Sequence, residues 1–100
     1  MLGEKLKELR EAKGILQKQV AQVLGVDTAY VSKMESAEKP VSQSYLAKLA
    51  LLYEVDENEL HTLWLAGKVY GLVKDHEQAL KAVQVAEMKI REKENAISYE

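Results

Sequence analysis

The sequence predicts an all-α protein with one compact helical domain and an appended helix. Apolar residues recur at spacings of three and four along most of the chain, which is the period of amphipathic helices. With 5 Tyr, 1 Trp and no Phe in 100 residues, the core must be filled mostly by Leu, Val, Ile and Ala. Such a core suits packed helices better than a sheet sandwich.

The first 25 residues predict two helices. Leu2, Leu6 and Leu9 share one face of a first helix, and Gly14 supplies its stop signal. A second helix of under three turns ends at Gly25, because a residue without a Cβ atom adopts the left-handed turn that helix C-termini favour.

A short third helix is expected directly after this turn. Asp27 is a good N-cap residue, and Val31 and Met34 then face inward while the side chains between them face outward. Pro40 prevents the helix from continuing through that point, because proline lacks the N–H that the next turn would need.

A fourth and a fifth helix complete the compact domain. Ser42 or Ser44 can cap the fourth helix. Asp56 and Glu59 have the spacing of a capping box, which opens a fifth helix that we expect to end near Gly67. Five short helices then form a domain over residues 1–69.

A sixth, longer helix is expected beyond Gly71 and defines an extension over residues 70–100. Its apolar stripe follows alternating steps of four and three, with His76 interrupting the apolar positions. A lone helix of this length is only marginally stable in water, so we expect the stripe to form part of a homodimer interface. The candidate interface residues are Leu72, Ala79, Val83, Ala86 and Ile90. The alternative is that the helix folds back onto its own domain near Trp64 and Leu65.

Composition excludes several classes of function. The chain has no Cys and only 2 His, so we expect neither a metal site nor a cofactor. His61 and His76 are isolated, and no catalytic triad or glycine-rich phosphate loop appears, so we expect no enzyme. The lack of a long apolar run argues against a signal peptide or membrane contact and favours a cytoplasmic protein.

The charge distribution limits where DNA could bind. A net charge of -2 and a pI near 5.7 argue against indiscriminate nucleic-acid binding. Residues 1–55 carry 8 Lys and Arg against 7 Asp and Glu, whereas residues 56–100 carry 6 against 9. Any surface that faces DNA should therefore lie in the first half of the chain.

Residues 17–36 have the pattern of a helix-turn-helix motif. Two short helices that cross steeply need a small residue where they touch, a glycine in the turn and apolar anchors on both helices. Ala21 and Gly25 meet the first two needs. The anchors are Val20, Leu24, Val26, Val31 and Met34. Each position is commonplace, but all of them at this spacing indicate the motif.

The arrangement resembles the Xre family of phage-repressor-like regulators over about residues 2–66. The resemblance implies a five-helix lambda-repressor-like domain that binds a palindromic operator in double-stranded DNA as a dimer and regulates transcription. It also implies an ion pair between Arg10 and Glu35 that ties the first helix to the third. Glu35 beside the domain interior would be expensive to bury unpaired. The alternative is two unrelated surface charges.

Matching positions imply which side chains contact DNA, since the N-terminal part of the second motif helix enters the major groove. The candidate base-reading residues are Thr28, Ala29, Ser32 and Lys33. Helix N-termini with nearby polar or basic side chains hold phosphates. The candidate phosphate contacts are Gln17, Lys18, Tyr30, Lys39, Ser42, Gln43 and Ser44. Each candidate has an alternative to phosphate contact. Tyr30 could simply cover the edge of the core, and the lysines could be solvated surface charges. The polar residues after Pro40 could serve only as helix caps.

Two positions depart from the family's pattern. Leu16 stands where a Thr or Ser usually caps the second helix, so that hydroxyl is missing. Ala37 stands where Gly is common, and because Ala tolerates a positive φ poorly, we expect a differently shaped turn after the third helix. Both departures bear on backbone contacts to phosphate.

The run from Leu63 to Tyr70 and the helix after it resemble a subgroup of short Xre regulators, some of them associated with restriction-modification operons. That resemblance implies a controller or repressor of its own operon, with RNA polymerase as a further partner. One alternative is an antitoxin whose C-terminal helix wraps a toxin. Another is a protein-interaction module that has lost DNA binding, for which the acidic pI is the main argument.

Overall fold

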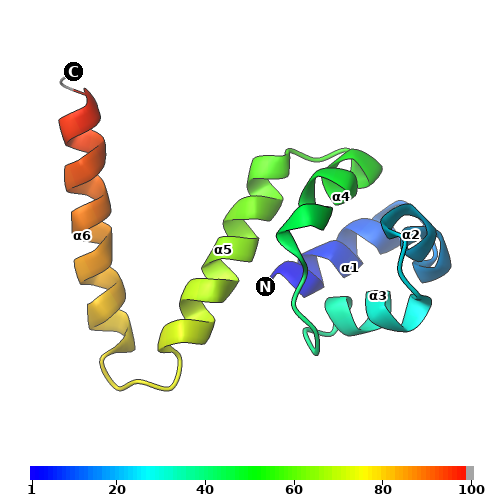
Figure 1. Cartoon of the computed structure of the whole chain (residues 1–100), viewed down its shortest axis with the longest axis horizontal. Helices are drawn as coiled ribbons and strands as arrows, with labels where there is room; N and C mark the ends of the chain where they lie inside the picture. Colours follow the sequence, from blue (N-terminus) through cyan, green and yellow to red (C-terminus); the bar gives the residue numbers. More distant parts are fainter. Residues whose placement is uncertain (99–100) are drawn as a thin grey trace. The chain divides into compact units, whose positions relative to one another are not determined.

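The structure is a computed structural model that describes residues 1–98, with side chains described through residue 96. Within these residues it contains helices and connecting turns and no strand, which confirms the predicted all-α class (Figure 1). The elements are α1 (Leu2–Ala12), α2 (Gln17–Leu24), α3 (Thr28–Glu35), the 3₁₀ turn η1 (Gln43–Tyr45), α4 (Leu46–Tyr53), α5 (Glu57–Val73) and α6 (Ala79–Ser98). No helix in this range is long and apolar enough to cross a bilayer.

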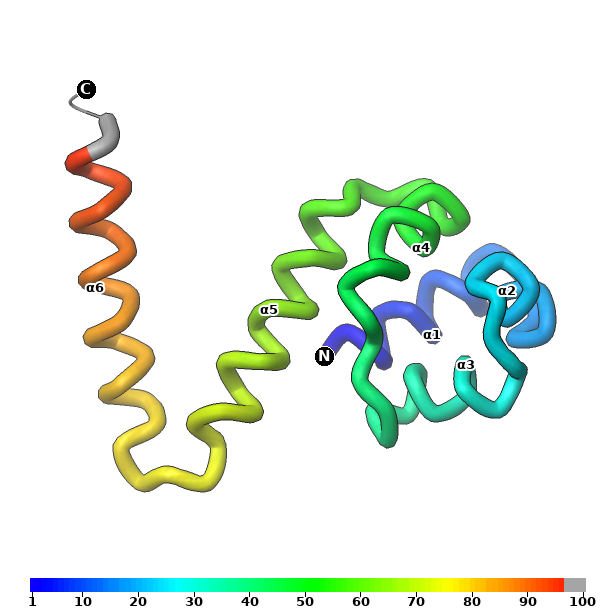
Figure 2. The backbone as a smooth tube through the Cα atoms, viewed as in Figure 1, coloured from blue at the N-terminus to red at the C-terminus, as the bar shows by residue number. Residues whose placement is uncertain are grey.

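The chain divides into two compact units within α5. The first unit comprises Met1–Lys68 and the second begins at Val69. In the first unit α3 packs against both α1 and α2, so that segments distant in sequence share one core (Figure 2). The core residues are Leu2, Leu6, Val20, Ala21, Leu24, Val31, Met34, Val41, Leu46, Leu49, Ala50, Tyr53 and Leu60.

Local signals set the ends of α2 and α3 as predicted. Gly25 ends α2 with a φ of 72°, in the left-handed region, and its N–H donates to the Ala21 carbonyl. The Asp27 carboxylate then accepts a hydrogen bond from the Tyr30 N–H at 2.8 Å and so caps α3. The two motif helices are thereby separated by only three residues, as the helix-turn-helix pattern requires.

The predicted end of the fifth helix near Gly67 is wrong. α5 continues through Gly67 and Gly71 to Val73, and neither glycine has a positive φ. Glycine permits a helix end but does not enforce one, and it costs only about 1 kcal/mol in a helix interior. The sixth helix consequently begins at Ala79, which leaves Leu72 on α5 and His76 in the connecting turn.

Gly3 lies at a close approach between α1 and the end of α3, a contact that the residue pattern does not predict. A Cβ atom at Gly3 would lie 2.5 Å from the Met34 carbonyl oxygen and 2.8 Å from that of Glu35. Both atoms belong to the backbone, which cannot move aside as a flexible side chain could. The missing side chain therefore lets the two helices touch.

We expect Gly3→Ala to lower the free energy of unfolding by about 1–3 kcal/mol, because the added methyl group overpacks this contact. Gly67→Ala is the matched control: it lies within α5, where an added Cβ atom would meet nothing within 4 Å. Alanine there should raise stability by about 0.5–1 kcal/mol. Urea denaturation of the two variants and of the unaltered chain measures both changes in the free energy of unfolding. Equal effects from the two substitutions would contradict the close contact at Gly3.

Candidate nucleic-acid interface

The α3 helix divides its side chains between the core and solvent. Val31, Met34 and Glu35 are buried. The four candidate base-reading residues share the exposed side: Thr28, Ala29, Ser32 and Lys33. Two of them carry a hydroxyl, one a methyl group and one a positive charge, which together match the donors, acceptors and methyl groups of the major groove. The arrangement lets α3 approach a duplex without uncovering the core.

A bidentate ion pair anchors the buried side of α3 to α1. Arg10 Nε donates to Glu35 Oε2 at 2.8 Å, and Arg10 Nη2 donates to Glu35 Oε1 at 3.1 Å. The Arg10 side chain is 13% exposed and that of Glu35 only 4%. Hydrogen bonding to Glu35 raises the pKa of the Arg10 guanidinium above its ordinary value. Low exposure and paired geometry make this contact a strong, charge-assisted one.

Two further hydrogen bonds extend this ion pair into a network. Gln17 Nε2 donates to Glu35 Oε1 at 3.0 Å, which connects the first residue of α2 to the end of α3. Arg10 Nη1 donates to the Ile15 carbonyl at 3.1 Å in the loop between α1 and α2. One buried carboxylate thus holds three helices in a common arrangement. The sequence had not indicated the role of Ile15, because a backbone acceptor leaves no mark on residue type.

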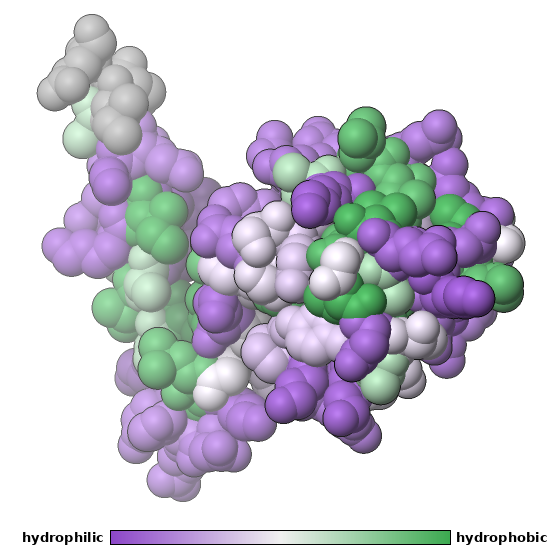
Figure 3. Space-filling model, turned by 45° about the vertical axis from the view of Figure 1, so that its right-hand side comes forward, coloured by the Kyte–Doolittle hydropathy of each residue, from purple (hydrophilic) through white to green (hydrophobic). Residues whose placement is uncertain are grey.

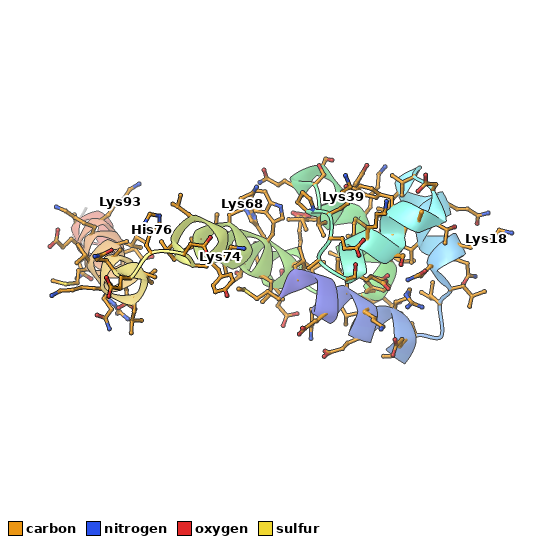
Figure 4. The ribbon with its side chains drawn as sticks, turned by 90° about the horizontal axis from the view of Figure 1, so that it is seen from below. Lys18, Lys39, Lys68, Lys74, His76 and Lys93 are labelled. Atoms are coloured by element: carbon orange, nitrogen blue, oxygen red, sulfur yellow. The ribbon has the colours of Figure 1, made fainter. Side chains whose placement is uncertain are left out.

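The N-terminus of α2 offers the first of the candidate phosphate contacts. Gln17 has two amide hydrogens, and Glu35 takes one of them, so the other remains for an anion. Lys18 is exposed and extends away from the first unit into solvent (Figure 4). Leu16 supplies no capping hydroxyl, but Gln19 Oε1 accepts a hydrogen bond from the Leu16 N–H at 2.8 Å. The helix start is therefore ordered without the usual cap.

The turn after α3 keeps a left-handed residue in spite of lacking glycine. Ala37 has a φ of 67°, so the expectation of a differently shaped turn was wrong in this respect. The left-handed conformation of a non-glycine residue costs about 1–2 kcal/mol. Hydrogen bonds from the N–H groups of Glu38 and Lys39 to the Lys33 carbonyl, at 2.9 and 3.2 Å, stabilise it. These bonds also bring Lys39 beside the C-terminal end of α3.

Tyr30 ties the following loop to α3. Its hydroxyl donates to the Pro40 carbonyl at 3.2 Å, and its ring meets that of Tyr45 edge-on with centroids 6.3 Å apart. A phenol has a single proton to donate. Tyr30 would have to release Pro40 before it could donate to a phosphate, so the structure favours its role as a cover over the core edge.

The residues before α4 form a polar cap. Ser42 Oγ and Ser44 Oγ lie 2.9 Å apart, and the Ser44 N–H donates to Ser42 Oγ at 3.4 Å. Gln43 lies between them and is exposed. Trp64 Nε1 of α5 donates to the Val41 carbonyl at 2.8 Å, which holds the start of this segment against the core. No group of three or more potential metal ligands occurs in residues 1–98.

Comparisons with known proteins agree with this geometry. Residues 1–63 match a family model described as a helix-turn-helix domain. The propionyl-CoA carboxylase regulator of Cereibacter sphaeroides is 40% identical over 60 residues, which are 60% of this chain and 13% of that protein. The chain therefore corresponds to a small part of that relative's length. No solved structure matches the chain.

We expect Arg10→Met to lower the free energy of unfolding by about 3–5 kcal/mol, because it leaves the Glu35 carboxylate buried and uncompensated. Lys13→Met is the matched control, since Lys13 forms an ion pair of 2.6 Å with Glu54, whose side chain is 77% exposed. Solvent screens that pair, so its loss should change stability little. Urea denaturation of both variants measures the two losses of unfolding free energy. Equal losses would show that the Arg10–Glu35 pair stabilises the fold no more than a solvent-exposed pair does.

Because the Tyr53 hydroxyl is buried, we expect the protein to lose stability at alkaline pH. Burial, reinforced by the negative charge of Glu35, raises the pKa of Tyr53 from 10.0 to about 12. Between these two values the unfolded chain loses the Tyr53 proton while the folded chain keeps it. The contribution of Tyr53 to the free energy of unfolding is therefore fully present below pH 10 and falls by up to about 2 kcal/mol as the pH approaches 12. Unfolding free energies measured across this range should fall less steeply in Tyr53→Phe than in the unaltered chain; parallel curves would contradict the assignment.

Proposed function

The chain belongs to the helix-turn-helix domain family, and we propose that it is a sequence-specific regulator of transcription that binds a palindromic operator as a dimer, with α3 in the major groove. The exposed polar side of α3, opposite a buried ion pair that fixes the helix, is the observation that carries this proposal. The name of the Cereibacter relative, a regulator, supports a role in gene control.

Base recognition is assigned to the exposed side of α3. Lys33 donates to the O6 and N7 atoms of guanine, and Thr28 pairs with donors or acceptors of several base edges. Ala29 contacts the methyl group of thymine, and its small size lets the helix backbone approach closely. Ser32 completes this surface with a hydroxyl that can donate or accept.

Phosphate binding is assigned to the two ends of the motif. At the first end, the N-terminus of α2 contributes its free N–H groups, the second amide hydrogen of Gln17 and the charge of Lys18. At the other end lie Lys39, Ser42, Gln43 and Ser44. Because the net charge of the whole chain is -2, affinity for DNA depends on these local groups rather than on a general positive field.

The finer assignment is an Xre-like, cytoplasmic regulator that controls its own operon, and the run from Leu63 to Tyr70 supports the restriction-modification controllers within that group. One half-site covers few base pairs, and this supports a dimer on a palindrome. An adjacent methyltransferase gene would favour the controller, whereas an adjacent toxin gene would favour an antitoxin.

Selection of bound sequences from random duplex DNA tests the proposal. We expect a palindromic consensus from the unaltered chain. Lys33→Ala should relax preference at one base position, at a cost of about 1–3 kcal/mol for the preferred base, because it removes a base contact. Lys18→Ala should weaken binding to all sequences alike, and the salt dependence of binding should fall by the amount expected for the loss of about one phosphate contact.

Lys81→Ala serves as the control for these two variants. It removes the same charge from an exposed position on α6, outside the assigned interface, and should leave selection and affinity unchanged. Equal, sequence-independent losses from Lys33→Ala and Lys18→Ala would refute the assigned roles. Failure to select any sequence would refute the proposed function itself.

A further inference from the structure

The second unit presents apolar surface that its own helical segments leave uncovered. Every described side chain of α6 after Ala79 is exposed, including Ile90 at 57%, and Leu72 at the end of α5 is 77% exposed. Apolar surface is visible along α6 in the space-filling view (Figure 3). A helix of this length that buries so little is marginal in water. An open groove of about 620 Å³ runs between the end of α5 and α6. Its apolar lining consists of Val69, Leu72, Val73, Ala82, Val83, Ala86 and Ile90.

One stripe of α6, which contributes Val83, Ala86 and Ile90 to the groove, alternates small and large residues. Ala79, Val83, Ala86 and Ile90 follow one another at steps of four, three and four, which places them on one stripe of the helix. The two alanines are one heptad apart, and so are the two β-branched residues. A partner helix that sets a large residue against each alanine would fill the stripe evenly.

We propose that α6 of a second copy fills this groove in the antiparallel direction. The two-fold axis passes between residues 84 and 85, so that Ala79 faces the partner's Ile90 and Val83 faces the partner's Ala86. Symmetry repeats both contacts, which gives four layers that each contain one alanine and one β-branched side chain. This arrangement deepens the dimer of the proposed function and rests on it.

The same register brings complementary charges together. Lys93 lies three residues beyond Ile90, so it extends about 4.5 Å past the start of the partner helix. The turn before that helix carries two carboxylates, Asp75 and Glu77, against one ammonium, Lys74, whereas Lys93 lies 14 residues after Ala79 on α6. Each Lys93 ammonium therefore meets an acidic turn of the other copy.

A parallel pairing fits these residues less well. Each residue of the stripe would then face its own copy, so that two layers contain only alanine and leave voids. Lys93 continues the stripe one step beyond Ile90, and in a parallel pair it would face the Lys93 of the partner subunit. Both the volumes and the charges thus favour the antiparallel dimer.

Disulfide trapping of the full chain without DNA tests the pairing, since the sequence contains no cysteine of its own. We expect a mixture of Ala79→Cys and Ile90→Cys chains to form a mixed covalent dimer on mild oxidation. Neither variant alone should do so, because 11 residues of helix separate the two equivalent positions by about 16 Å, whereas a disulfide needs Cα atoms within about 7 Å. Lys81→Cys, on the side of α6 away from the stripe, controls for random collisions.

A residue exchange gives a second, independent readout. Val83→Ala empties two layers and Ala86→Val overfills the same two, so each should raise the dissociation constant of the dimer about tenfold. The double variant restores one small and one large residue in both layers and should dimerise nearly as well as the unaltered chain. Sedimentation equilibrium measures the constants, and circular dichroism checks that the helices persist.

Several outcomes would overturn the pairing. A covalent dimer of Ala79→Cys alone, or tighter association of Ala86→Val, would show a parallel pair. A chain that stays monomeric would overturn the pairing and leave the groove open to a different occupant, such as a helix of another protein. A monomer that still selects a DNA sequence would refute this pairing and the dimer of the proposed function, but not base recognition by α3. A trapped dimer that selects no sequence would refute DNA recognition, but not the pairing.

Discussion

The ion pair between Arg10 and Glu35 is the interaction on which the arrangement of the first unit depends. A carboxylate with a side chain only 4% exposed cannot remain charged in the interior without partners, because transfer from water costs several kcal/mol. Glu35 obtains three hydrogen bonds, two from Arg10 and one from Gln17. These donors come from α1 and α2, so the requirement of one buried charge fixes three helices relative to one another.

This constraint determines what the outer side of α3 can do. With Val31, Met34 and Glu35 held in the interior, the helix cannot rotate to hide its polar residues, and a pre-ordered surface faces solvent. The close contact at Gly3 sets α1 against the same end of α3 to which Glu35 belongs. Tyr30 and the Lys33 carbonyl hold the following loop next to the same helix. The interface is thus set by packing on the opposite side of α3.

The features that the sequence predicts well are those with a local cause. Gly25 and Asp27 mark their helix ends because the conformation of one residue and the reach of one side chain decide them. The features it missed depend on distant partners. Gly3 looks unfavourable within a helix until the Met34 carbonyl is seen beside it, and Gly67 looks like a stop although nothing in the fold requires α5 to end there.

The candidate site shows the same limit. The exposure of Thr28, Ser32 and Lys33 follows from helical periodicity, which residue type alone reveals. Residue type does not reveal the hydrogen bond from Gln17 to Glu35 or the one from the Tyr30 hydroxyl to the Pro40 carbonyl. Both depend on which group lies opposite in the folded structure. Likewise, the apolar stripe that the sequence analysis assigned to one C-terminal helix is divided between α5, the connecting turn and α6. Spacings of three and four residues continue across the short turn, so they do not reveal it.

A double-mutant cycle on Arg10 and Glu35 tests most directly whether their attraction holds the helices together. Urea denaturation of Arg10→Met, Glu35→Met and the double variant gives the coupling free energy. We expect a coupling of about 2 kcal/mol or more, with the double variant losing much less stability than the two single variants combined. Losses that add to within about 0.5 kcal/mol would show independent residues and would contradict the central role of the pair.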